Sequence, residues 1–204
     1  MNINFDFSTI KFDYNSVVII TYLFISLGAW LLNIISRGKT NKWFFECYRS
    51  SPLNPLTYVR LFTHCIGHKD IDHLIGNFLY ILLVGPMIEE KYGSVNLIIM
   101  FLITSLIIGL YNIIFNNYNI KGASGNVYLL IVLSSFSNIS EGKIPLTVLL
   151  ILIFYVVGEA RKTITDRKSS SYHDGHLIGA ICGLLFGFFF LKYNSFLDLI
   201  NLIK

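Results

Sequence analysis

The sequence predicts an all-α membrane protein, a bundle of six transmembrane helices with a long interfacial loop between helices 1 and 2. Hydrophobic residues make up 54% of the 204 residues and charged residues only 14%, with a mean hydropathy of +0.62. A soluble domain carries about 25% charged residues, so this chain falls well short. The charges also cluster, and the uncharged stretches between them approach the roughly 20 residues that a helix needs to cross the hydrocarbon core.

Six uncharged segments account for the predicted helices. In chain order they are residues 14–36, 74–88, 94–120, 122–140, 144–158 and 175–191. The second and fifth are short, and we expect them to borrow flanking residues or to lie partly inside the bundle. We expect a single domain over residues 1–204, with a short N-terminal segment (1–15), a six-helix core (16–192) and a short C-terminal tail (193–204).

The N-terminal residues, the cysteines and the net charge indicate further properties of the protein. No cleaved targeting segment is expected, because residues 1–15 have neither a basic region nor an apolar run and contain no arginine. Three cysteines form an odd number without framework spacing, so we expect free thiols. The net charge of +4 is spread over loops with no basic stripe, which argues against nucleic acid as a partner.

Two polar intervals, residues 37–72 and 159–174, separate the predicted helices. The first mixes charges with aromatic residues such as Trp43 and Tyr48, as in a segment that lies along the bilayer surface. The second is basic and serine-rich, and we expect it to be mobile. Eleven of the 16 basic residues fall in the loops after helices 1, 3 and 5, so the positive-inside rule would place both termini outside the cell.

The segment Gly122-Ala123-Ser124-Gly125 puts a serine at the predicted start of a helix. Gly122 and Gly125 permit tight turns and the close approach of another chain. The N–H groups and the positive dipole end at a helix N-terminus favour a nearby alkoxide or oxyanion. The alternative is a packing patch of small residues, which is common between membrane helices.

His176 opens the last apolar segment, where an ionisable side chain is by default a functional candidate. Gly179, Gly183 and Gly187 follow at i+3, i+7 and i+11, so they lie on the histidine's own helical face. Such a stripe would let a neighbouring backbone approach and would bring His176 within hydrogen-bonding reach of Ser124, as the base for a nucleophile. The alternative is a glycine zipper with an incidental histidine.

A third cluster lies at the start of the second helix. His73 and Asn77 are four residues apart and share a helical face, where their N–H groups would form an oxyanion hole. The alternative is a metal site of His64, His68 and His73 with Asp72, but a zinc protease of the HExxH kind needs a glutamate between its histidines, and none stands there. We expect no metal and no cofactor, with His64 and His68 hydrogen-bonding the loop backbone.

Taken in order, these motifs resemble those of the rhomboid intramembrane serine proteases, from about residue 60 to about residue 187. Rhomboids carry an arginine, spaced histidines and H-x-x-x-N, followed by a glycine and an acidic residue near the inner end of the second helix. Their nucleophile motif is G-x-S-G with an aromatic residue four positions later, and their base motif is H-x-x-G-x-x-x-G. The matching residues are Arg60, His64, His68, His73 and Asn77; Gly85, Glu89 and Gly93; Gly122 to Gly125 with Tyr128; and His176, Gly179 and Gly183.

The resemblance implies an intramembrane serine endopeptidase that cuts transmembrane proteins in or near their membrane-spanning segments, at small residues. Ser124 and His176 would form a catalytic dyad without a third acid, His73 and Asn77 would bind the oxyanion, and Tyr128 would pack against the imidazole. The protein would be a multi-pass protein of a lipid bilayer, which we expect to be a bacterial cell membrane. Its termini would be cytoplasmic, contrary to the distribution of basic residues.

The chain departs from the family pattern at three positions that concern packing. Val59 stands where rhomboids usually have a tryptophan, Leu129 where they often have a glycine, and Asn126 is more polar than usual. Two other functions stay open. A non-catalytic scaffold that binds transmembrane helices would not react with a serine-directed phosphonate, and a transporter would have two related halves, of which the sequence has no sign.

Overall fold

The computed structural model describes residues 14–116, 118–136 and 170–193, together with isolated residues between 146 and 161. In these ranges the chain is built from helices, and the only extended pairing is an isolated bridge between Cys47 and Ile120. The elements are α1 (Val17–Ile35), the π-helix η2 (Asn41–Phe45), α2 (Pro55–Thr63), α3 (Ile71–Tyr92), α4 (Ser94–Phe115), α5 (Ser124–Ser134) and α8 (Ser170–Lys192). The predicted all-α fold is confirmed.

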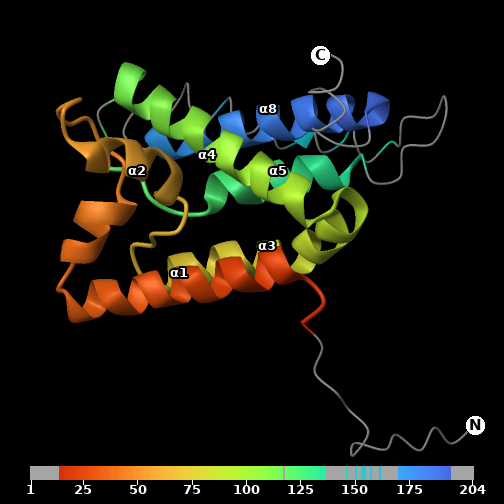
Figure 1. Ribbon diagram of the computed structural model, residues 1–204. Coiled ribbons are helices and arrows are strands. Elements are labelled where there is room, and N and C mark those ends of the chain that lie inside the picture. Colours follow the sequence, from red (N-terminus) through yellow and green to blue (C-terminus); the bar gives the residue numbers. More distant parts are fainter. Residues whose placement is uncertain are drawn as a thin grey trace, which may run out of the picture.

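The short helix α5 lies at the centre of the bundle. Figure 1 shows α1 beside α3 along one side and α8 along the opposite side, and α5 packs against both α3 and α8. Leu129, Leu130 and Leu133 of α5 are buried with Phe78 of α3 in the main apolar core. Ser124, the first residue of α5, is therefore held half-buried at the start of this central helix.

Four of the helices are long and apolar enough to cross a membrane: α1, α3, α4 and the part His173–Lys192 of α8. α5 is a shorter apolar helix of 11 residues. The predicted helix at 144–158 and most of the loop 159–174 lie outside the described residues, apart from isolated positions. The count of six spanning helices therefore stays a prediction.

Several helix boundaries differ from those expected. α3 runs beyond residues 74–88 at both ends, and Asp70 caps its start by accepting a hydrogen bond from the His73 backbone N–H at 2.8 Å. α4 ends at Phe115 instead of continuing to residue 120, because the chain after it leaves the helix to pair with Cys47. α8 begins at Ser170, ahead of the expected start at residue 175.

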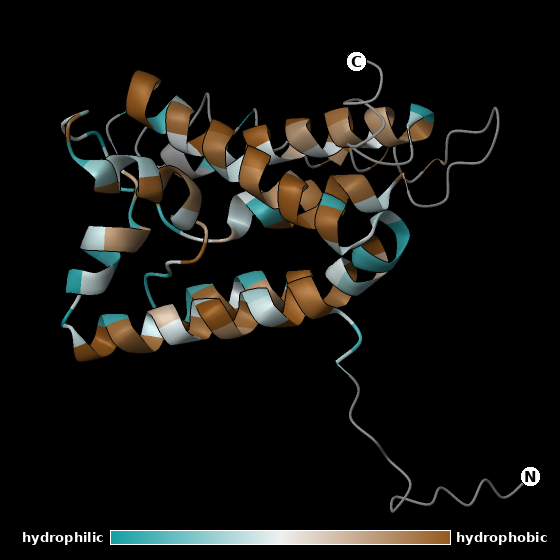
Figure 2. Ribbon diagram, viewed as in Figure 1, coloured by the Kyte–Doolittle hydropathy of each residue, from teal (hydrophilic) through white to brown (hydrophobic). Residues whose placement is uncertain are grey.

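The long helices consist mostly of hydrophobic residues, as the brown colouring of their ribbons in Figure 2 shows, and many of these residues are exposed. Leu79 and Leu83 of α3 are 63% and 77% exposed, and Ile114 and Phe115 of α4 are 59% and 70% exposed. Exposed apolar side chains in such numbers are unfavourable in water, and on helices long enough to span a bilayer they mark contact with a membrane. The protein is an integral membrane protein whose helices present this surface to acyl chains.

Glu89, near the end of α3, joins the beginnings of two other helices. Its carboxylate accepts hydrogen bonds from the backbone N–H groups of Val18 (2.9 Å) and Ile19 (3.2 Å) in the first turn of α1. It also accepts a hydrogen bond from the Ser94 hydroxyl (2.7 Å) at the start of α4. The Ser16 side chain makes no cap, so the Glu89 carboxylate satisfies the otherwise unpaired donors of α1 and lies at the positive end of its dipole.

We expect Glu89→Ala to lower the free energy of unfolding by about 2–4 kcal/mol, because it leaves the N–H groups of α1 without an acceptor and removes a charge-assisted bond to Ser94. Thermal unfolding in detergent micelles measures the effect. Glu90→Ala is the matched control, since Glu90 is the exposed neighbour. Equal loss of stability in the two variants would contradict this role for Glu89.

Candidate active site

Ser124 is the first residue of α5, and a tight turn at Gly122 leads the chain into that helix. Gly122 has a φ of +127°, a conformation that residues with a side chain rarely adopt. A Cβ at this position would also lie 2.6 Å from Cε1 of the His73 ring. The Gly122 N–H donates to the His64 carbonyl at 2.9 Å, so the turn before the serine is anchored on the loop between α2 and α3.

Glycines bring α8 into direct contact with α5. A Cβ on Gly179 would lie 2.9 Å from the carbonyl carbon of Gly125 and closer still to its oxygen, and a Cβ on Gly183 would lie 2.7 Å from the Leu129 carbonyl oxygen. The start of α8 also meets α5, since a Cβ on Gly125 would be 3.5 Å from the Gly175 carbonyl oxygen. The two helices therefore touch backbone to backbone on the glycine face of α8.

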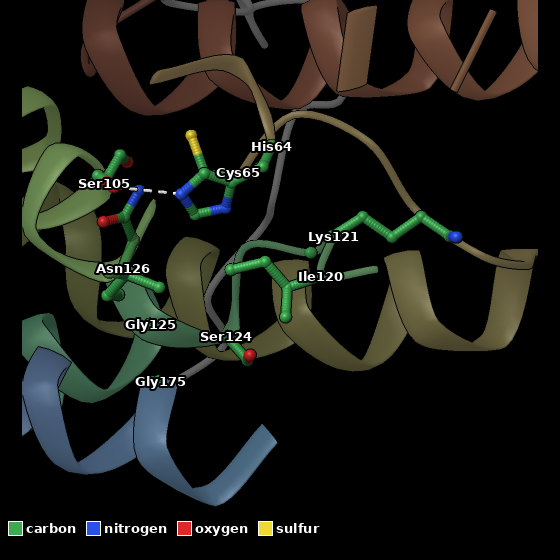
Figure 3. Close-up of a pocket in the computed structure, with 11 residues that line it drawn as sticks. His64, Cys65, Ser105, Ile120, Lys121, Ser124, Gly125, Asn126 and Gly175 are labelled. Atoms are coloured by element: carbon green, nitrogen blue, oxygen red, sulfur yellow. Dashed lines mark hydrogen bonds between the residues drawn. The ribbon is translucent and has the colours of Figure 1, made fainter. Parts of the chain in front are cut away.

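His176 reaches α5 beside the serine. Its ring stacks on the Tyr128 ring, with centroids 4.3 Å apart and planes inclined by 15°. Tyr128 is four residues after Ser124, so both side chains lie on one face of α5. In Figure 3 the Ser124 hydroxyl lies on the side of α5 toward the first turn of α8. The structure thus brings Ser124, Tyr128 and His176 together at the junction of the two helices.

His68 lies directly behind the serine turn. Its Nδ1–H donates to the Ile66 carbonyl at 3.0 Å, so its Nε2 carries the free electron pair. That Nε2 accepts hydrogen bonds from Asn77 Nδ2 (3.1 Å) and, at 3.4 Å, from the backbone N–H of Ala123. Sequence reasoning assigned His68 only to loop structure, but this ring connects the loop, α3 and the residue before the serine.

His73 and Asn77 both converge on Gly122 from α3. The His73 ring lies against Gly122 and makes an edge contact with the His68 ring, at 5.2 Å between centroids. Asn77 Nδ2 is 3.7 Å from the position that a Gly122 Cβ would occupy. These two side chains therefore stand next to the N-terminus of α5, on the side of the site that His68 supports.

Arg60 and His64 hold the loop between α1 and α3 in shape. The Arg60 guanidinium is 1% exposed, lies 4.1 Å from the centre of the Tyr48 ring and donates to the Ser50 hydroxyl at 2.6 Å. His64 is also buried, and its Nε2–H donates to the Ser105 carbonyl on α4 at 3.0 Å. With His64 and His68 engaged in this way, no group of three or more histidine, cysteine or acidic side chains is placed for a metal among the described residues.

Several contacts hold this loop against the segment before Ser124, and sequence reasoning did not predict them. Lys121 forms an ion pair with Glu46 at 2.8 Å, and Cys47 pairs with Ile120 through two backbone hydrogen bonds of 2.9 and 3.0 Å. Arg49 donates to three carbonyls at the end of α4, those of Ile113, Ile114 and Asn116. The partners are far apart in sequence, and no motif spacing indicates them.

Asp174 is turned toward α4, since its Oδ2 accepts a hydrogen bond from Asn116 Nδ2 at 3.0 Å.

A small cavity of about 30 Å³ lies beside Ser124, between the loop, α4 and α5 (Figure 3). Its lining includes polar groups of His64, Ser105, Lys121 and Asn126. A volume of this size with polar walls is sufficient for about one water molecule.

Burial keeps His68 in its neutral form and, together with the neighbouring His73, lowers its pKa from 6.5 to about 4. Protonation of Nε2 would remove the acceptor for Ala123 N–H and Asn77. Since the unfolded chain binds this proton at about pH 6.5 and the folded chain only near pH 4, the contribution of His68 to stability is complete above about pH 6.5 and is lost as the pH falls to about 4.

The full effect of His68 amounts to about 3 kcal/mol over that pH range. We expect the melting temperature in detergent to fall between pH 6.5 and pH 4 more steeply for the wild type than for His68→Gln, which has no ring to titrate. Equal pH slopes for the two proteins would contradict this assignment.

Comparison with known proteins identifies the family. Residues 55–193 match the sequence model of the Rhomboid domain, a range that contains all the candidate site residues. The chain belongs to the rhomboid family.

Two relatives of this rhomboid illustrate the range of the family. It is 32% identical to Rhomboid-related protein 1 of Caenorhabditis elegans over 145 residues, which cover 66% of this chain and 40% of that protein. It is 26% identical to Rhomboid protease GluP of Bacillus subtilis (strain 168) over 166 residues, which cover 78% of this chain and 33% of that protein. The matched region thus spans less than half the length of either relative.

Proposed function

We propose that this rhomboid is an intramembrane serine endopeptidase that hydrolyses peptide bonds in or near the transmembrane segments of other membrane proteins. The stacking of the His176 ring on Tyr128 carries this proposal, because it fixes an imidazole one helical turn from Ser124. The backbone contact between Gly179 and Gly125 supports it by holding α8 against the start of α5. Similarity to a relative named a rhomboid protease gives independent support.

The reaction proceeds by a Ser–His dyad. Ser124 Oγ attacks the scissile carbonyl carbon while the His176 imidazole takes the hydroxyl proton. His176 then gives this proton to the leaving amine, and the acyl group stays on Ser124. Water attacks the ester with His176 again as the base, which releases the second product and restores the serine. Asp174 takes no part, since its carboxylate is bound to Asn116 on α4.

The negative charge that develops on the carbonyl oxygen is bound at the N-terminus of α5. The backbone N–H of Ser124, the Asn77 amide and the His73 ring are the donors, and His68 positions Asn77 through the 3.1 Å hydrogen bond to Nε2. Loss of one such donor typically lowers kcat by about 10²–10³. The polar cavity beside Ser124 supplies the hydrolytic water.

The substrates are transmembrane helices that unwind near the cut and carry small residues there.

We further propose that residues 1–204 form one domain in a bacterial cell membrane, with cytoplasmic termini and an active site that opens to the opposite face. Epitope tags on either terminus, probed with protease in intact and opened cells, test this orientation against the one that the basic residues favour.

A fluorophosphonate probe tests the catalytic proposal on the purified protein in detergent. An activated serine reacts with the probe, so the wild type is labelled while Ser124→Ala and His176→Ala are not. Absence of labelling in a folded wild type, or labelling that persists in Ser124→Ala, contradicts the proposal. In that case the non-catalytic scaffold becomes the better account, and the next experiment captures bound transmembrane helices.

A further inference from the structure

The segment that follows α1 has one face fixed to the protein and another that is free. Residues 39–45 are helical, and η2 makes up most of them. On the inner side Asn41 is 4% exposed, and its Nδ2 donates to the His68 carbonyl at 2.9 Å. Phe45 lies so close to Gly67 that a Cβ there would be 2.6 Å from the Phe45 carbonyl oxygen. The position of η2 is therefore determined by the loop that carries His68.

The outer side of the same segment carries positive charges and aromatic rings. Arg37, Lys39 and Lys42 are all exposed. Beside them Trp43 is 53% exposed and Phe44 is 40% exposed. Arg37 lies in the turn after α1 with a φ of +52°, so the turn directs the chain from α1 straight into this charged segment.

No acidic side chain neutralises these three cations within the described part of the chain. The sequence from residue 14 to residue 45 contains neither aspartate nor glutamate. The next acid along the chain, Glu46, is already paired with Lys121 at 2.8 Å. The remaining nearby cation, Arg49, is bound to carbonyls at the end of α4 and belongs to the fold rather than to this surface.

The depth of the segment in the bilayer follows from the helix that precedes it. α1 is apolar enough to cross the membrane, and Ile34 and Ile35 in its last turn are 54% and 78% exposed. Arg37 follows Ile35 by two residues and Trp43 follows it by eight, which places them at the level where acyl chains give way to headgroups. Tryptophan prefers this interface, and lysine and arginine there attract anionic lipids.

We propose that Arg37, Lys39 and Lys42, together with Trp43, bind the phosphate headgroup of an anionic phospholipid. The ammonium and guanidinium groups donate charge-assisted hydrogen bonds to the phosphate oxygens, and the Trp43 ring lies along the glycerol and upper acyl chain. Each basic residue near the surface raises the affinity for an anionic lipid about fivefold. A soluble polyanion matches this surface less well than a lipid does, because the exposed apolar end of α1 lies next to the charges and favours a ligand with acyl chains. This inference does not depend on the proposed proteolysis.

Tryptophan fluorescence in vesicles tests the proposal on the full chain. Trp30 and Trp43 are the two tryptophans, so Trp30→Phe leaves Trp43 as the sole reporter. In phosphatidylcholine vesicles we expect brominated phosphatidylglycerol to quench Trp43 more strongly than brominated phosphatidylcholine at equal mole fraction. Should Trp30→Phe fail to fold, the Trp43 signal is obtained as the difference between the wild type and Trp43→Phe.

Two sets of variants separate lipid binding from a general effect of charge. The triple variant Arg37→Gln/Lys39→Gln/Lys42→Gln should abolish the preference for phosphatidylglycerol over phosphatidylcholine. The triple variant Arg37→Lys/Lys39→Arg/Lys42→Arg, which conserves the charges, should keep this preference. Lys192→Gln, an exposed cation in the last turn of α8, should also keep it. Equal quenching by both lipids in the wild type overturns the proposal, as does a preference that survives the triple glutamine variant or is lost equally in Lys192→Gln.

Discussion

Ser124→Ala and His176→Ala are each expected to reduce kcat by about 10⁴–10⁶, and the double variant is expected to be no slower than either one. The reason is that in the proposed mechanism the two groups act as a unit in proton transfer, so that removing one leaves the other without a function. The measurement is cleavage of a transmembrane reporter peptide, labelled with a fluorophore and a quencher, by protein reconstituted in vesicles.

Ser134→Ala provides the matched control for this series, because Ser134 lies at the other end of α5, where its hydroxyl donates a hydrogen bond to the Ile131 carbonyl at 2.7 Å. It should retain activity close to that of the wild type. Additive losses in the double variant would contradict a dyad, and so would cleavage by Ser124→Ala above the level of an enzyme-free sample.

Gly179→Ala is expected to separate α8 from α5 and to lower the free energy of unfolding by about 1–3 kcal/mol or more. The added Cβ would meet the Gly125 backbone, which cannot move aside as a flexible side chain does. Since His176 is carried by the same helix, we also expect fluorophosphonate labelling to fall. Thermal unfolding in detergent and labelling of the surviving folded protein measure the two effects separately.

Gly28→Ala is the matched control for the glycine variant. Gly28 lies inside α1, and a Cβ there would meet no atom within 4 Å. Alanine favours a helix by up to about 1 kcal/mol over glycine, so this variant should be as stable as the wild type or more so. The same melting temperature for Gly179→Ala and Gly28→Ala would mean that α5 and α8 are not packed backbone to backbone.

Most of the helical architecture follows from the sequence because each spanning helix is a local pattern. The uncharged stretches predict α1, α3 and α4, and the glycine spacing predicts which face of α8 meets another backbone. The spacing of four residues likewise puts His73 beside Asn77, and Ser124 beside Tyr128, on a common helical face. Such inferences need only the 3.6-residue period of the helix.

Contacts between distant segments could not be predicted in this way. Nothing in a single sequence pairs Glu46 with Lys121 or Cys47 with Ile120, although these contacts end α4 early and anchor the turn before Ser124. The part played by His68 was missed for the same reason. Its ring accepts from Ala123, 55 residues away, and loop residues have no periodicity from which that partner could be read.

The position of His176 on the last described helix also has a consequence for biosynthesis. Helices enter the membrane in the order in which the ribosome makes them, so α5 with Ser124 is inserted before α8 exists. In the proposed mechanism, Ser124 lacks its base, His176, until α8 docks through its glycines, and until then its hydroxyl is no more nucleophilic than that of any other serine. A nascent chain would therefore be harmless to the newly made membrane proteins that share its translocon, and proteolysis would begin only with the completed bundle.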